Sequence, residues 1–170
     1  MEVYEAIRGR RSIRSFTSAK VPKKILDEIL DAGRWAPSAG NVQARQFMVV
    51  SKEKTKINIA DASNGQWFIS KAPVVIAVCA DYIIQAMYGD RGRNLYVIMD
   101  CAASVQNMML AAHALGLGSC WVSSFDDAKV RKILKLDNRL AAVALIALGY
   151  PAETPEAPQR RPLKELVKYA

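Results

Sequence analysis

The stretch that decides the fold runs from Asn94 to Val122 and reads NLYVIMDCAASVQNMMLAAHALGLGSCWV. Its first part, up to Leu115, is apolar almost all round, with alanines interleaved among larger side chains. This pattern predicts a long helix buried at the centre of a domain. Two glycines then end the helix, and residues 119–122 have the pattern of a short strand.

The flanking sequence predicts helices and strands of ordinary length on both sides of this stretch. Apolar residues at helical spacing predict helices over 3–9, from Pro22 to before Pro37, over 53–62 and, capped by Asp126, over 128–134. Apolar, β-branched runs predict strands over 46–50, 73–80 and 140–148. Helices and strands mix without strict alternation, and no G-x-G-x-x-G follows a strand, so we expect an α+β layered domain rather than a Rossmann fold.

The sequence changes character after Tyr150. Pro151, Pro155, Pro158 and Pro162 fall within twelve residues and cannot belong to a regular element. We therefore expect an extended C-terminal arm with one helical turn after Pro162. Such an arm lies on its own domain or reaches across to a partner.

Length and composition describe an ordinary globular chain. With 170 residues, 51% of them hydrophobic, we expect one domain over 1–170. The start has no apolar signal region, and we expect a cytoplasmic protein that does not associate with membranes. Three cysteines without a C-x-x-C pair and a single histidine, His113, exclude the common zinc sites. A Ser-His-Asp triad would have to use His113, which we expect to be a core residue of the central helix.

The net charge of +8 is unevenly distributed. Between Arg8 and Lys24 the chain carries seven basic residues and no acidic one. Such a segment attracts an anion, although a solvated basic face would have the same composition. Nucleic acid is one candidate, but no helix-turn-helix, RNP or zinc-finger motif accompanies the charge. A small phosphorylated ligand is the sharper hypothesis.

Three polar motifs are candidates for binding such a ligand. Arg10-Arg11-Ser12-Ile13-Arg14 places guanidinium groups and a hydroxyl where they match phosphate oxygens, and Arg160-Arg161 offers a second fork if the arm folds back. The turn Pro37-Ser38-Ala39-Gly40-Asn41-Val42-Gln43 carries amides and a hydroxyl suited to the polar edge of a planar heterocycle, and Asn64 has the same capacity.

In this order the motifs resemble those of the nitroreductase family of flavin mononucleotide (FMN) oxidoreductases. The resemblance covers nearly the whole chain and includes the A-P-V-V-I strand at 72–76 and the helix that carries Asp100, Gln106 and Asn107. It implies a nitroreductase-like α/β layered sandwich with a central, mostly antiparallel sheet. It also implies a homodimer with FMN at the subunit interface.

The resemblance assigns a role to each polar motif. Arg10, Arg11, Ser12 and Arg160, with Arg161, would hold the phosphate and ribityl chain, and Arg14 would lie near the N1/O2 edge of the flavin. The partner subunit would contribute Pro37, Ser38, Asn41 and Gln43. Asn64 aligns with an amide that contacts the isoalloxazine, and Ser123 and Ser124 fall beside flavin N5, although these two serines could also begin a helix.

The activity that the resemblance implies is hydride transfer from NADH or NADPH through flavin N5 to a nitroaromatic, a quinone or another planar electrophile. The cofactor supplies the redox chemistry, so no catalytic base or nucleophile is expected. A non-catalytic flavin-binding protein of the same fold and a basic nucleic-acid-binding domain are the alternatives.

The chain departs from the family pattern at three places. Many relatives continue the Gln43 motif with Pro-Trp, where this chain has Ala44-Arg45. Some carry lysine where this chain has Trp67. The segment between Asp81 and Asn94 is too short for the helical insertion of larger members, so we expect an open acceptor pocket.

Overall fold

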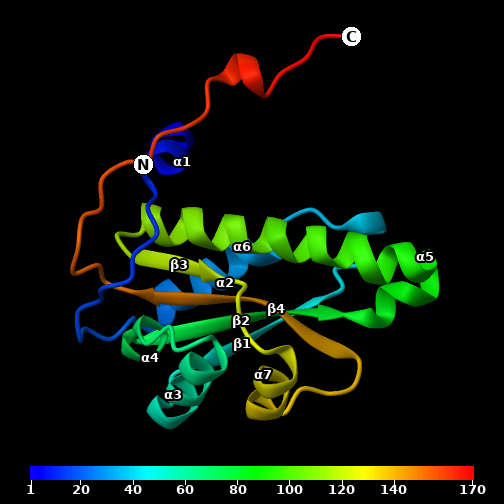
Figure 1. The fold of residues 1–170 in the computed structure, drawn as a ribbon, viewed down its shortest axis with the longest axis horizontal. Coiled ribbons are helices and arrows are strands. Elements are labelled where there is room, and N and C mark those ends of the chain that lie inside the picture. Colours follow the sequence, from blue (N-terminus) through cyan, green and yellow to red (C-terminus); the bar gives the residue numbers. More distant parts are fainter.

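The computed structural model describes residues 1–170 and has a four-stranded antiparallel sheet between layers of helices (Figure 1). The strands are β1 (Arg45–Val50), β2 (Val74–Asp81), β3 (Gly118–Val122) and β4 (Leu140–Gly149), in the order β1-β2-β4-β3. The helices are α1 (Val3–Gly9), α2 (Lys23–Arg34), α3 (Glu53–Ala62), α4 (Phe68–Lys71), α5 (Gln85–Arg91), α6 (Val97–Ala114) and α7 (Asp127–Leu134). The predicted α+β layered architecture is confirmed.

The central strands β2 and β4 separate two hydrophobic cores. Successive side chains of a strand point to opposite faces, so Ile76 and Ile146 face α2 and α6, while Val75 and Leu145 face α3 and α7. Every residue of β2 is buried. This two-sided burial explains why 73–80 reads as an uninterrupted apolar run and not as an alternating one.

The central helix differs from its prediction in one respect. Its inner face is buried against the sheet through residues such as Cys101, Val105 and Met108. Its outer face is not covered: Ile98 is 39% exposed and Met99 58% exposed. The all-round apolar pattern therefore predicted burial on both sides, but a single chain buries only one.

The helical segment is also longer than expected. One helical stretch, Tyr82–Ala114, is long and apolar enough by length and composition to cross a membrane, although it contains polar residues such as Asp100, Gln106, Asn107 and His113. Two of those residues, Asp100 and Asn107, bind main-chain groups of the protein itself. Together with the packed inner face, this is the pattern of a core helix of a globular protein.

The edge strand β3 holds the basic segment in place. Ser12 forms a parallel bridge with Ser119, and the Ile13 N–H donates to the Ser119 carbonyl at 3.0 Å. The Ile13 side chain is buried against Gly118, where a Cβ atom would lie 2.7 Å from Ile13 Cγ1. Since neighbouring side chains of an extended segment alternate, burial of Ile13 directs Ser12 and Arg14 outward.

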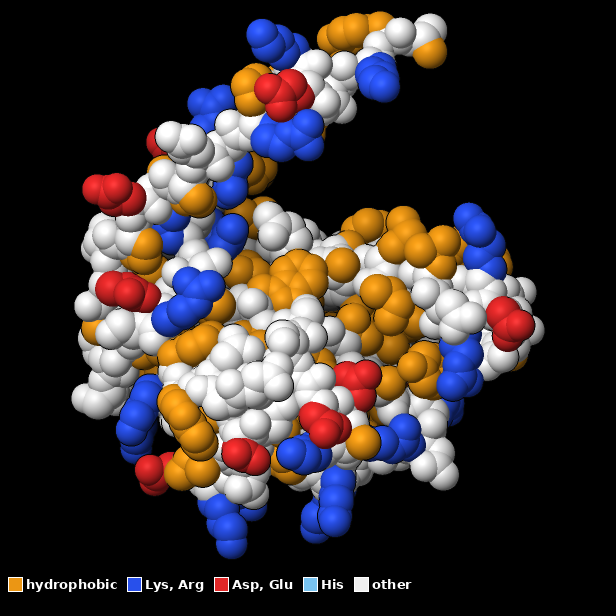
Figure 2. Space-filling view, viewed as in Figure 1, with side chains coloured by type: hydrophobic (Ala, Val, Ile, Leu, Met, Phe, Trp, Pro, Cys, Tyr) orange, Lys and Arg blue, Asp and Glu red, His pale blue; other side chains and the backbone are white.

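The C-terminal arm is extended as predicted, with one short helical turn at Leu163–Glu165. It passes beside α1 and then projects from the body of the molecule (Figure 1). Its apolar side chains find no cover on this chain, since Leu163 is 74% and Tyr169 97% exposed. Figure 2 shows the arm standing clear of the body, with hydrophobic side chains gathered on the body along the side that it leaves open.

We expect Gly118→Ala to destabilise the protein by about 1–3 kcal/mol, because the new methyl group meets the buried Ile13 side chain. Urea denaturation measures the change. Ile13→Ala removes the atoms in conflict, so adding Gly118→Ala to that variant should cost little. An equal cost in both backgrounds would contradict the close packing of these two residues.

Candidate functional site

The first part of the site is the basic cluster, formed by Arg10, Arg11, Ser12, Arg14 and Arg160. These residues line a cavity of about 410 Å³ together with the arm residues Pro155, Glu156 and Pro158. The arm therefore does fold back far enough to bring Arg160 beside the Arg10 motif. Arg161 does not line this cavity; its Nε lies 3.2 Å from Glu165 in the same arm.

Arg10 is the residue of the basic cluster that has a buried nitrogen without a partner. Its Nη1 is buried and has no hydrogen-bond partner, although the residue as a whole is half-buried. Burial lowers the pKa of Arg10, and the neighbouring Arg160 and Arg11 guanidinium groups lower it further. A partly desolvated cation surrounded by other cations is unfavourable until an anion joins it, so the basic cluster is suited to receive one.

Glu153 is the acidic group that anchors the arm to this segment. Its carboxylate accepts hydrogen bonds from the Arg14 and Ser15 main-chain N–H groups, at 2.9 Å for Ser15. Because it binds main-chain N–H groups, it leaves the Arg14 side chain free to face elsewhere. The Arg14 guanidinium lies 5.9 Å from the centre of the Phe68 ring.

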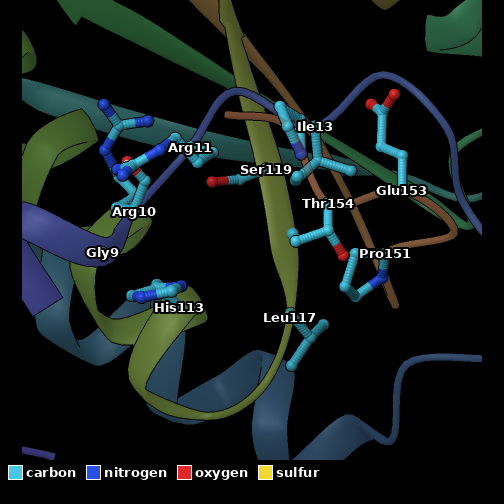
Figure 3. Close-up of a pocket in the computed structure, with 12 residues that line it drawn as sticks. Gly9, Arg10, Arg11, Ile13, His113, Leu117, Ser119, Pro151, Glu153 and Thr154 are labelled. Carbon is cyan, nitrogen blue, oxygen red and sulfur yellow. The ribbon is translucent and has the colours of Figure 1, made fainter. Parts of the chain in front are cut away.

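A smaller cavity of about 170 Å³ adjoins the basic cluster (Figure 3). Gly9, Arg10 and Arg11 line it from the end of α1, His113 from α6, and Ser119 from β3. His113 therefore lies at the C-terminal end of α6, beside two arginines, and not in the core as its apolar neighbours predicted. Burial lowers the pKa of His113, and Arg10 and Arg11 lower it further.

The second part of the site is the polar loop, Pro37–Gln43, which joins α2 to β1. The Gln43 N–H donates to Ser38 Oγ at 3.0 Å, and Gln43 Nε2 donates to Asn41 Oδ1 at 3.2 Å. Three of the four predicted residues thus bind one another within the loop. Pro37 and Ser38 line a cavity of about 330 Å³ with Tyr96, which directly precedes α6, and with Met99 and other α6 residues.

The third part is the amide corner, formed by Asn64, Ser123 and Ser124. Asn64 follows α3 with a left-handed φ of 57°, which asparagine tolerates better than most residues, and its Nδ2 donates to Ser124 Oγ at 2.9 Å. Trp121 Nε1 donates to Ser123 Oγ at 2.7 Å. The serines do not begin a helix, because α7 starts at Asp127 and Asp126 accepts from the Lys129 N–H.

Sequence reasoning missed one residue of this corner. Gln66 Nε2 donates to the Ser124 carbonyl at 3.2 Å and to the Ser63 carbonyl at 3.0 Å, so it ties the end of α3 to the end of β3. A second amide two residues after Asn64, across the turn at Gly65, was the available signal.

The three parts do not meet in one chain. The basic cluster and the amide corner both lie along β3, and Arg14 approaches Phe68 between them. The polar loop instead lies near Asp100, while His113 marks the basic cluster at the other end of α6. His113 lies thirteen positions after Asp100 in the helix, which is about 20 Å at a rise of 1.5 Å per residue.

The chain is similar in sequence and in structure to proteins of a known family. The nitroreductase family model matches residues 7–150, which is most of the chain. The chain belongs to the nitroreductase family. This confirms the resemblance seen in the sequence and the expectation of an oxidoreductase of the nitroreductase type.

Individual relatives of this family member agree over nearly its full length. A Methanothermobacter thermautotrophicus protein with the provisional name NADH dehydrogenase/NAD(P)H nitroreductase is 35% identical, and the match covers 91% of this chain and 80% of the relative. An FMN-dependent nitroreductase from Clostridium difficile superposes with a TM-score of 0.80 at 29% identity, covering 92% of this chain and 91% of that one. NADPH:FMN oxidoreductase from Vibrio harveyi, in complex with NAD⁺, has a TM-score of 0.91 at 26% identity, covering 98% and 76%.

We expect His113 to make stability depend on pH near its ordinary pKa. The folded protein binds this proton less readily than the unfolded chain, so the contribution is complete above the unfolded pKa of about 6.5 and is lost as pH falls through it. His113 is the single histidine, so comparison with His113→Gln isolates the effect. The urea midpoint of the wild type should fall more steeply from pH 7 to 5 than that of the variant. Equal slopes would contradict the lowered pKa.

Proposed function

We propose that this family member is an FMN-dependent oxidoreductase that transfers hydride from NADH or NADPH to a nitroaromatic, a quinone or a similar planar electrophile by a ping-pong mechanism. The observation that carries the proposal is the buried, unpartnered Nη1 of Arg10, a half-buried residue of the basic cluster. The names of the relatives support the same cofactor and the same electron donors.

The basic cluster fits the phosphate end of FMN. A phosphate supplies several charged acceptors at once, and guanidinium forks bind it in pairs. Arg10 lacks a partner, and Arg160 comes to the same cavity from the arm. Ser12 adds a hydroxyl that its bridge to β3 holds at the cavity wall. Arg161, bound to Glu165 in this chain, would join the phosphate only by exchanging that partner.

The amide corner and Arg14 fit the heterocycle of the flavin. Flavin presents alternating donors and acceptors along its pyrimidine edge, and amides such as Asn64 can match both kinds. A fixed positive charge at Arg14, near the N1/O2 edge, would stabilise the anionic reduced form. Trp67, which stands where some relatives have lysine, is 54% exposed and adds no cation, so Arg14 carries this role.

The proposal includes a homodimer in which each site is built by two chains. Within one chain the polar loop lies beside Asp100 and the basic cluster beside His113, and these two residues are about 20 Å apart along α6. A two-fold axis that pairs α6 with α6 in opposite directions would bring the loop of one subunit to the basic cluster of the other. The exposed apolar side chains Ile98 and Met99 on α6 and Tyr4 on α1 supply a surface for such pairing.

The residues of the chain bind, orient and polarise, and none is required as an acid or base. Bound FMN would supply the redox step by accepting hydride at N5 and passing electrons to the acceptor. Arg10 and Arg160 would hold the cofactor at its phosphate, Asn64 would align the ring, and Arg14 would stabilise the charge that reduction adds. Donor and acceptor would use the same open face in turn.

The purified protein should show flavin absorption, and anaerobic NADH or NADPH should bleach it faster than it reduces free FMN.

Arg10→Ala should weaken FMN binding by about 10- to 100-fold, because it removes a charge-assisted pair worth roughly 1.5–3 kcal/mol. Arg8→Ala, two residues away, removes the same charge at an exposed site and should have little effect. Unchanged FMN affinity in Arg10→Ala would refute the binding assignment. Bound flavin that NAD(P)H does not reduce would favour a non-catalytic flavin protein.

Ile98→Glu should convert the dimer to a monomer and release FMN, because it places a charge at the proposed α6 pairing surface. Ile57→Glu is a matched control, since Ile57 is 42% exposed on α3 and Ile98 39% exposed on α6. Analytical ultracentrifugation measures the mass, and absorbance of the washed protein measures retained flavin. A dimeric Ile98→Glu variant that keeps FMN would contradict the two-chain site.

A further inference from the structure

The backbone of the polar loop adopts a conformation that most residues avoid. Gly40, Asn41 and Gln43 have φ angles of 54°, 54° and 53°. Left-handed residues other than glycine each cost free energy, and a run of them persists only where surrounding contacts enforce it. The loop therefore requires anchors outside itself.

Arg45, the first residue of β1, supplies the main anchor. Its Nη2 donates to the Arg34 carbonyl at 3.1 Å and to the Ala36 carbonyl at 2.7 Å, and its Nη1 lies 3.5 Å from the Pro37 carbonyl. These carbonyls run from the end of α2 into the loop. A cation is well placed there, because the C-terminal end of a helix carries partial negative charge and unpaired carbonyls.

Asp100 supplies the second anchor from α6. Both of its carboxylate oxygens accept from the Ala39 N–H, at 3.1 and 3.2 Å, and its side chain is almost fully buried. Arg45 binds carbonyls and Asp100 binds an N–H, so together they satisfy both kinds of main-chain group over residues 34–39. Burial raises the pKa of Asp100, while the Ala39 N–H and the nearby Arg45 lower it.

Tyr88 of α5 closes the third side of the loop. A Cβ atom at Gly40 would lie only 2.1 Å from the Tyr88 hydroxyl oxygen. Gly40 is thus required both by its φ and by this contact. Arg45 binds the main chain where it enters the loop, and Asp100 binds the Ala39 N–H within the loop. The loop therefore has little freedom to adopt another shape.

We propose that Arg45, together with Asp100, is a positioning residue that holds the polar loop in the conformation in which it meets the flavin. The inference rests on the proposed function. Arg45 follows Ala44 at the place where the family resemblance leads one to expect a Pro-Trp pair. A side chain that donates to three carbonyls takes the place of a stiff dipeptide.

The test compares variants that remove the guanidinium and keep the aliphatic stem. Arg45→Met removes the anchor. Arg131→Met is the control, because Arg131 likewise donates to main-chain carbonyls, those of Leu140 and Asp137, but lies on α7 below the sheet. The dissociation constant for FMN, the visible circular dichroism of the bound flavin and the thermal midpoint are measured for each holoprotein.

If Arg45 positions the loop, Arg45→Met raises the FMN dissociation constant by about tenfold or more and changes the flavin dichroism. Arg45→Lys has a smaller effect in the same direction, because one ammonium reaches fewer carbonyls. Arg131→Met lowers only the thermal midpoint. If Arg45 merely caps α2, both Met variants lose thermal stability alone, and the inference is overturned.

Two further outcomes are decisive. If Arg45→Met does not fold, Arg45→Lys decides: an FMN dissociation constant within twofold of the wild type and an unchanged dichroism spectrum overturn the inference. A wild-type protein that does not take up FMN overturns the proposed function and this inference with it. The wild-type measurement therefore separates failure of the function from failure of the positioning role.

Discussion

The structure depends on the way α6 divides its apolar surface. Its inner face packs across β2 and β4 and completes one of the two cores, while its outer face keeps Ile98 and Met99 in solvent. Exposing large side chains next to one another is unfavourable unless another surface covers them. In the proposed homodimer, a second copy of the same helix covers this outer face. One group of the proposed binding residues lies beside each end of α6, the polar loop near Asp100 and the basic cluster near His113.

Local structure could be predicted from the sequence because its causes are local. The helix over 53–62 and the Asp126 cap were predicted at the residues where they occur, since apolar spacing and capping side chains act within a turn. The order of the strands was not predicted, because it depends on which surfaces meet across the core and periodicity carries no information on that. The family resemblance, and not the periodicity, implied that the polar loop joins the site from the partner subunit. The helices between Asp81 and Asn94 were also missed, because Gly89 and Gly92 interrupt their pattern.

The clustered arginines of the basic cluster destabilise the folded chain locally. Arg10, Arg11, Arg14 and Arg160 converge on one cavity, and the one carboxylate fixed among them, that of Glu153, binds main-chain N–H groups of the Arg10–Ser15 segment. Such convergence raises the free energy of the folded chain. The sequence predicted that Arg160 joins the Arg10 motif if the arm folds back, and the structure brings the two together in one cavity. A structural role would place acids opposite these cations. Glu156 is the one acidic residue that lines the cavity. A binding site for an anion requires such a shortage of acidic partners, because any acid paired with Arg10 would compete with the ligand.

The polar loop is likewise unfavourable on its own, here in its backbone conformation. The left-handed residues Asn41 and Gln43 cost backbone free energy, even though they bind one another and Ser38 within the loop. Holding them there takes strong contacts, and a half-buried guanidinium and a buried carboxylate, each bound to the main chain, are among the strongest available without a metal. Lysine in place of Arg45 could not bridge carbonyls that diverge from the end of a helix, because it lacks the planar fork. An arginine at the first residue of a strand, facing a helix end and not solvent, is therefore best explained by the loop it restrains. The hydrogen bonds of Arg45 also stabilise the end of α2, but capping that helix requires only one of the three carbonyls that Arg45 binds.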